Sequence, residues 1–103
     1  MSMNPVHHET VNKCKFNFLK LSSKRQLDIH DKALLVSDIT QLLGLYTLSY
    51  DIQLHHLLHD MVNFGEQNNL VLAGQRLRFD ELNRKYKMPI DYKQIRWEPS
   101  FLK

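Results

Sequence analysis

The chain has 103 residues, the length of one domain, and 43% of them are hydrophobic, which excludes an intrinsically disordered protein. Its net charge of +3 is modest. No apolar run is longer than that over residues 33–36, which falls far short of the ~20 residues that cross a bilayer, so no membrane partner is expected. Residues 1–11 carry no signal-peptide pattern and are expected to form a flexible leader to a single globular domain over residues 12–103. A single cysteine favours a cytoplasmic location.

Near the start of this domain, apolar and polar residues alternate. Cys14, Phe16 and Phe18 are separated by Lys15 and Asn17. This period of two predicts a half-buried N-terminal β-strand. Cys14 itself is expected to be a small buried hydrophobe rather than a nucleophile, because no spacing ties it to a base.

Two amphipathic helices are predicted next. Over residues 28–46, apolar side chains recur at helical spacing, and Asp28 or Asp31 can cap the start. Gly44 suits the position just past the end of that helix. The second helix is expected over residues 50–67, with Ser49 as its N-cap.

A β-hairpin is predicted over residues 70–79. With Gly74 and Gln75 as a two-residue turn, the leucines and Phe79 fall on one face of the hairpin. Arg76 and Arg78 then fall together on the opposite face, which points to water. A short helix over residues 80–89, capped by Asp80, and an extended tail complete the chain.

The predicted fold class is therefore α+β and mostly helical. Two helices followed by a hairpin resemble, in architecture only, the second half of a winged-helix domain over residues 30–79. The resemblance implies a DNA-binding regulator with a wing tip at Gly74. Two departures are visible: only two clear helices precede the wing, and the helix before it has no lysine or arginine.

Basic residues gather at the predicted hairpin and the helix after it. Arginine and lysine in such a cluster supply the electrostatic part of nucleic-acid binding. We therefore expect a small non-enzymatic regulator of transcription, dimeric and in contact with DNA. The predicted contact residues are Arg76, Arg78, Arg84, Lys85 and Lys87.

An alternative hypothesis comes from the stretch between the basic ends of the chain. Residues 34–75 contain no lysine or arginine, and charge-poor surfaces with aromatic residues are typical of interface centres. The chain is then an adaptor or an inhibitor that binds a protein partner or a second copy. The predicted interface residues are Tyr46, Tyr50, Ile52, His55 and His59.

The histidines raise the question of a metal. His55 and His59 are spaced as a metal-binding pair, but the glutamate of the zinc-protease pattern is missing. A solvated helix flank is the preferred interpretation of these histidines, with no metal and no other cofactor. No glycine-rich phosphate loop or nucleophile elbow is present either, so no enzymatic activity is expected.

Overall fold

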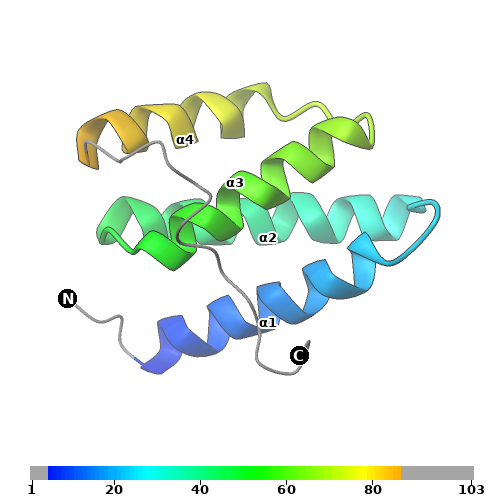
Figure 1. Ribbon diagram of the computed structural model, residues 1–103, viewed down its shortest axis with the longest axis horizontal. Coiled ribbons are helices and arrows are strands. Elements are labelled where there is room, and N and C mark those ends of the chain that lie inside the picture. Colours follow the sequence, from blue (N-terminus) through cyan, green and yellow to red (C-terminus); the bar gives the residue numbers. More distant parts are fainter. Residues whose placement is uncertain (1–4, 87–103) are drawn as a thin grey trace.

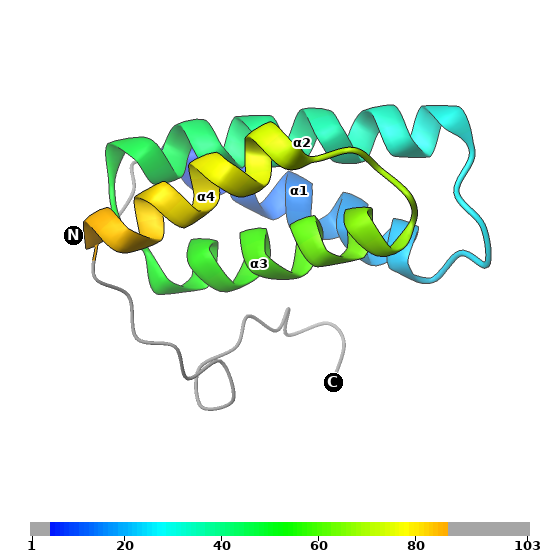
Figure 2. The same cartoon turned by 90° about the horizontal axis from the view of Figure 1, so that it is seen from above.

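The computed structural model describes residues 5–86, which form four α-helices (Figure 1). Helices α2 and α3 run antiparallel. Helix α1 lies against one side of this pair and α4 against the other, as the two views in Figures 1 and 2 show. The helices are α1 (Pro5–Ser22), α2 (Ile29–Leu48), α3 (Ile52–Gln67) and α4 (Ala73–Tyr86). The predicted α+β class is therefore wrong, because residues 5–86 contain no strand.

Helix α1 replaces the predicted N-terminal strand, and it begins at Pro5, inside the expected leader. The alternation at Cys14, Phe16 and Phe18 spans too few residues to define a period. Over a longer window, the buried side chains recur at helical spacing, whereas Phe16 is 50% exposed. These buried side chains are Val11, Cys14, Phe18 and Leu21. The burial of Cys14 confirms its prediction as a core residue.

Helix α2 begins as the sequence predicts and ends later. Asp28 and Asp31 form a capping box, in which Asp31 N–H donates to Asp28 Oδ1 at 2.8 Å and Asp28 N–H donates to Asp31 Oδ2 at 3.2 Å. Lys24 adds an ion pair to Asp31 at 2.8 Å. The predicted end at Gly44 is wrong, because the helix runs through this glycine to Leu48.

Helix α3 is present as predicted, but its caps differ. The N-cap is Asp51 rather than Ser49, and its Oδ1 accepts from the N–H groups of Gln53 at 2.9 Å and Leu54 at 3.0 Å. At the other end, Asn69 adopts a φ of 67°, and the N–H of Leu70 donates to the carbonyl of Gly65 at 3.0 Å. This is a Schellman motif with asparagine in the left-handed position.

Helix α4 occupies the segment that was predicted to be a hairpin. A type II′ turn requires a positive φ at its glycine, and no glycine in residues 5–86 has one. Leu72, Phe79 and Leu82 are buried at helical spacing, and the arginines and the glutamate between them are good helix formers. The hairpin and the winged-helix resemblance are therefore wrong. Asp80 lies inside this helix and caps nothing, while Lys87 and the predicted tail lie outside the described residues.

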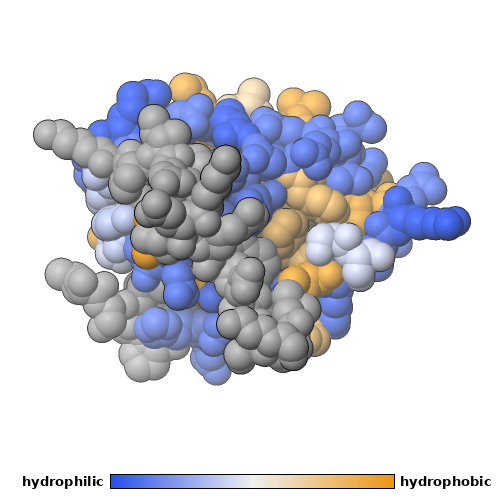
Figure 3. Space-filling model, in the orientation of Figure 1, coloured by the Kyte–Doolittle hydropathy of each residue, from blue (hydrophilic) through white to orange (hydrophobic). Residues whose placement is uncertain are grey.

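The core lies between α2 and α3 and extends under both outer helices. Its completely buried side chains include Leu35, Ile39 and Leu42 of α2 and Leu54, Leu57 and Leu58 of α3. Phe18 of α1 meets Phe64 of α3 edge to face at 5.4 Å. The surface seen in Figure 3 is mostly hydrophilic over α4, with scattered apolar residues, and an apolar area lies between α3 and α1. None of the helices in residues 5–86 has the length and apolar character of a membrane span.

The two candidate caps of α3 make a matched test. We expect Asp51→Ala to lower the free energy of unfolding by about 1 kcal/mol, because two backbone N–H groups lose their acceptor. Ser49→Ala should leave it unchanged within about 0.5 kcal/mol, since only its backbone takes part in capping. Urea denaturation of the two variants measures both values. An equal loss from both substitutions would contradict this assignment.

Candidate functional site

A buried polar cluster joins three helices. The hydroxyl of Tyr46 on α2 donates to Oδ1 of Asn83 on α4 at 2.7 Å. His55 on α3 places Nδ1 at 2.9 Å from the same oxygen and at 3.1 Å from the Tyr46 hydroxyl. Because an amide oxygen only accepts, Nδ1 of His55 carries the hydrogen. Tyr46 and His55 are completely buried, so this cluster belongs to the interior of the domain.

Tyr86 attaches the end of α4 to the end of α2. Its hydroxyl lies 2.8 Å from the carbonyl of Tyr46 and 3.2 Å from that of Thr47. Both carbonyls belong to the last turn of α2, where no intrahelical N–H remains to satisfy them. Its ring also packs against those of Tyr46, at 5.3 Å, and Tyr50, at 5.6 Å. The phenol therefore caps α2 from outside the helix.

The predicted protein-interface residues lie partly in the core and partly at the surface. Tyr46 and His55 face each other inside the core and present no surface to a partner. Ile52 and His59 are partly exposed, and Tyr50 is 39% exposed. The face that α2 and α3 share is thus the interior of the domain. The expectation of a solvated histidine flank is also wrong for His55 and for His56, which is 4% exposed.

The described residues of the predicted nucleic-acid contact do not gather on one surface. Arg76 turns toward α3, where Nη2 donates to Glu66 Oε1 at 2.7 Å and to Asn63 Oδ1 at 2.6 Å. Arg78 turns toward α2, and Arg84 and Lys85 are exposed in the last turn of α4. Without a hairpin, and with Arg76 held in an ion pair, the proposed DNA contact and the transcriptional role that depended on it are wrong.

Two further reactive groups, the thiol of Cys14 and the carboxylate of Asp38, lie in the interior. Burial, and then the charge of Asp38, raises the pKa of the Cys14 thiol to about 12, so it is not a nucleophile at neutral pH. Asp38 is itself buried and accepts from Asn17 Nδ2 at 3.1 Å. Within the described part of the chain, no three histidine, cysteine or acidic side chains are arranged to hold a metal ion.

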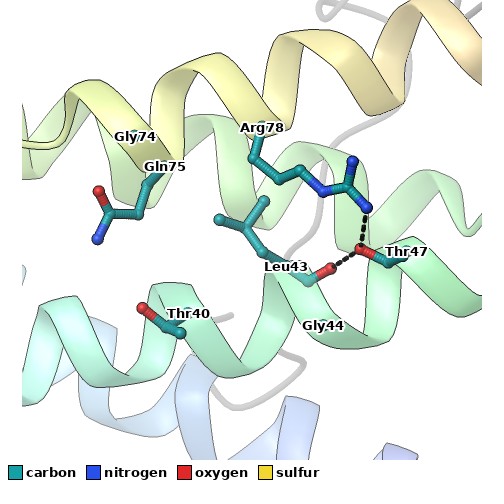
Figure 4. A pocket seen from close by; sticks show the side chains of 7 residues that line it. All are labelled: Thr40, Leu43, Gly44, Thr47, Gly74, Gln75 and Arg78. Carbon is teal, nitrogen blue, oxygen red and sulfur yellow. Dashed lines mark hydrogen bonds between the residues drawn. The ribbon is translucent and has the colours of Figure 1, made fainter.

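A groove remains on the outer side of the contact between α2 and α4, with a volume of about 430 Å³ (Figure 4). Leu43 points up between the two helices, with Thr40 and Gly74 toward one end and Thr47 and Arg78 toward the other. The full lining is Thr40, Leu43, Gly44, Thr47, Gly74, Gln75 and Arg78. This is the best candidate site in residues 5–86.

The lining is almost uncharged and largely satisfied within the chain. Thr40 and Thr47 donate their hydroxyl hydrogens to the carbonyls of Val36 at 2.9 Å and Leu43 at 2.7 Å. Their donors are therefore unavailable to a ligand. Only Arg78 contributes a charge, and its Nη2 lies 3.5 Å from the Thr47 hydroxyl.

One feature of the sequence points to this groove, namely the scarcity of charged residues along α2. Between Ala33 and Tyr50 the only charged residue is Asp38, which is buried. Helix α2 therefore shows solvent a face without charge over most of its length, where lysine and glutamate are usual. The same lack of basic residues led to the predicted interface around Tyr46 and His55, but these two side chains lie in the core.

The chain was compared with known proteins. No family model matches it, and neither does any curated protein or any solved structure.

The buried histidine makes stability depend on pH. Burial is the main reason that the pKa of His55 falls from 6.5 to about 4, opposed by the hydrogen bond to Asn83. The unfolded chain therefore takes up a proton first as the pH falls, and stability present above pH 6.5 is lost toward pH 4. Between pH 7 and pH 5 we expect this residue to account for about 2 kcal/mol.

Denaturant unfolding at a series of pH values measures this dependence. The His55→Gln variant should lose most of the slope between pH 7 and pH 5. The His59→Gln variant should retain it, because the His59 side chain is 28% exposed. An unchanged slope in His55→Gln would show that the effect arises elsewhere.

Proposed function

We propose that this chain is a non-enzymatic protein-binding domain that holds a helical segment of a partner protein in the groove between α2 and α4. The observation that carries the proposal concerns two helical glycines, Gly44 and Gly74. Both line one groove with a single charged residue, and the packing of the described fold requires glycine at neither position. The proposed surface lies outside the contact between α2 and α3.

The three glycines of the chain differ in what they do. A Cβ on Gly65 would lie 2.6 Å from Leu72 Cδ1, so a side chain there would displace a core residue. A Cβ on Gly44 or Gly74 would meet nothing within 4 Å, and neither residue has a positive φ. Glycine inside a helix such as α2 costs about 1 kcal/mol relative to alanine, and somewhat less in a first turn. These two glycines weaken their helices and give the described fold nothing in return.

A second backbone could use the space that these glycines leave. Glycine permits close approach of another chain because it has no side chain. Helices α2 and α4 run in the same direction on either side of the groove (Figure 2), so a third helix can lie along it. The charge-free outer face of α2 continues this surface beyond the groove, and depletion of charge is typical of the centre of an interface.

A non-enzymatic role is supported by the chemistry of the lining. Threonine, leucine, glycine, glutamine and arginine side chains surround the groove, and none of them exchanges a proton near neutral pH without activation. The single cysteine lies in the core, away from solvent. We place this binding role in the reducing environment of the cytoplasm.

Filling the groove should separate folding from binding. We expect Gly44→Gln combined with Gly74→Gln to raise the free energy of unfolding by about 1 kcal/mol, because both helices gain propensity and the side chains enter open space. The same variant should lose binding. The probe is a display library of helical peptides of about 18 residues, randomised on one face and selected against the full chain.

The matched control is Asn12→Ala, which also improves helix propensity but lies on the exposed face of α1. It should bind the selected peptides as the wild type does, measured by fluorescence polarisation. If no peptide binds more tightly than about 100 μM, or if the filled variant binds equally well, the proposal is wrong. If filling the groove instead converts a dimer to a monomer in sedimentation, the occupant is a second copy of the chain and the proposed partner is wrong.

A further inference from the structure

We infer that the segment held in this groove is acidic at one position, where a carboxylate pairs with Arg78. The inference rests on the proposed function and specifies the partner chemistry that the groove selects. Its basis is the contrast between two arginines on one helix, together with the charge distribution around the groove.

Arg76 and Arg78 are two residues apart on α4 and have different surroundings. Arg76 is matched within the chain: Nη2 and Nε both reach the carboxylate of Glu66, at 2.7 Å and 3.4 Å. Arg78 is exposed, and its Nη2 lies at the long distance of 3.5 Å from the hydroxyl of Thr47. No carboxylate in residues 8–86 forms an ion pair with it. Arg78 therefore retains most of its hydrogen-bonding capacity.

The lining of the groove does not supply the missing acid. From Ala33 to Leu48 the exposed face of α2 has no charged residue, and Asp38 is buried with its Oδ2 accepting from Asn17. The groove is thus a weakly polar surface with one positive charge at its edge. A planar guanidinium in such a place binds a carboxylate through two parallel N–H···O bonds, more strongly than in open water.

The position of Arg78 also fixes the spacing within the partner. Arg78 follows Gly74 by one helical turn and extends across the groove toward Thr47 (Figure 4). A helix lying along the groove therefore meets the glycine end and the arginine end about one turn apart. We expect a small or apolar residue against Gly74 and an aspartate or glutamate three or four positions away, in either chain direction.

The peptide library gives the direct test. Peptides selected against the wild type should be enriched in aspartate or glutamate at one position, three or four residues from a small residue. Replacing that acid by its amide, or making Arg78→Gln in the protein, should each weaken binding by about 10- to 100-fold, and the two changes together should weaken it no further. Arg78→Lys should fall between, because it keeps the charge but loses the fork.

Selection against Arg78→Glu should reverse the preference and enrich lysine or arginine at the same position. The matched control is Arg84→Gln, which removes an exposed charge from α4 outside the groove and should leave selection unchanged. Peptides that depend on Gly44 and Gly74 but show no acidic position would overturn this inference and leave the proposed function standing. If no selected peptide depends on the two glycines, both the proposed function and this inference are wrong.

Discussion

The hydrogen bonds among Tyr46, His55 and Asn83 are the constraint on which the arrangement of α4 depends. Helix α4 buries few large side chains of its own, mainly Phe79 and Leu82. Apolar burial is not directional, so these two residues alone would allow the helix to slide or rotate. The cluster removes that freedom, because one amide oxygen must reach two donors from two other helices.

Once Asn83 is fixed, the rest of α4 follows from helical geometry. Tyr86 lies one turn further on the same face and reaches the carbonyls at the end of α2. Arg76 and Arg78, two residues apart, differ by about 200° around a helix, so they point to opposite sides. One therefore contacts α3 and the other α2. On a strand the same two side chains would share a face. The predicted DNA contact through both arginines therefore depended on a β-strand, with its period of two, over this segment.

The sequence predicts the parts of the fold that rest on long apolar repeats. Helices α2 and α3 extend over enough turns for their periodicity to be clear, and the capping pair at the start of α2 is visible in the order of residues. The sequence does not reveal helix α1, because Phe16, which faces solvent, completes a false alternation with Cys14 and Phe18. Nor does it reveal helix α4, because Gly74 suggests a turn, whereas the chain turns at Asn69.

The candidate site was harder to predict for a different reason. Its lining combines residues of α2 and α4 that are 27 or more positions apart in the chain, counted from Thr47 to Gly74. Their proximity follows from long-range contacts of Tyr46 with Phe79, Asn83 and Tyr86. The absence of charge in α2 was visible, but its helical face could be assigned only once the core was known. Sequence patterns show the composition of each helix, whereas the groove exists only where α2 and α4 meet in the folded chain.

The glycines show where local preference and the fold disagree. Natural sequences are locally consistent for the most part, and departures concentrate at functional positions. Gly65 is consistent with the fold, since Leu72 packs where its side chain would be. Gly44 lowers the stability of the longest helix in residues 5–86 and is matched by no contact in the chain. Under the proposed function, this glycine serves the partner: the groove that it lines with Gly74 is where another backbone meets α2.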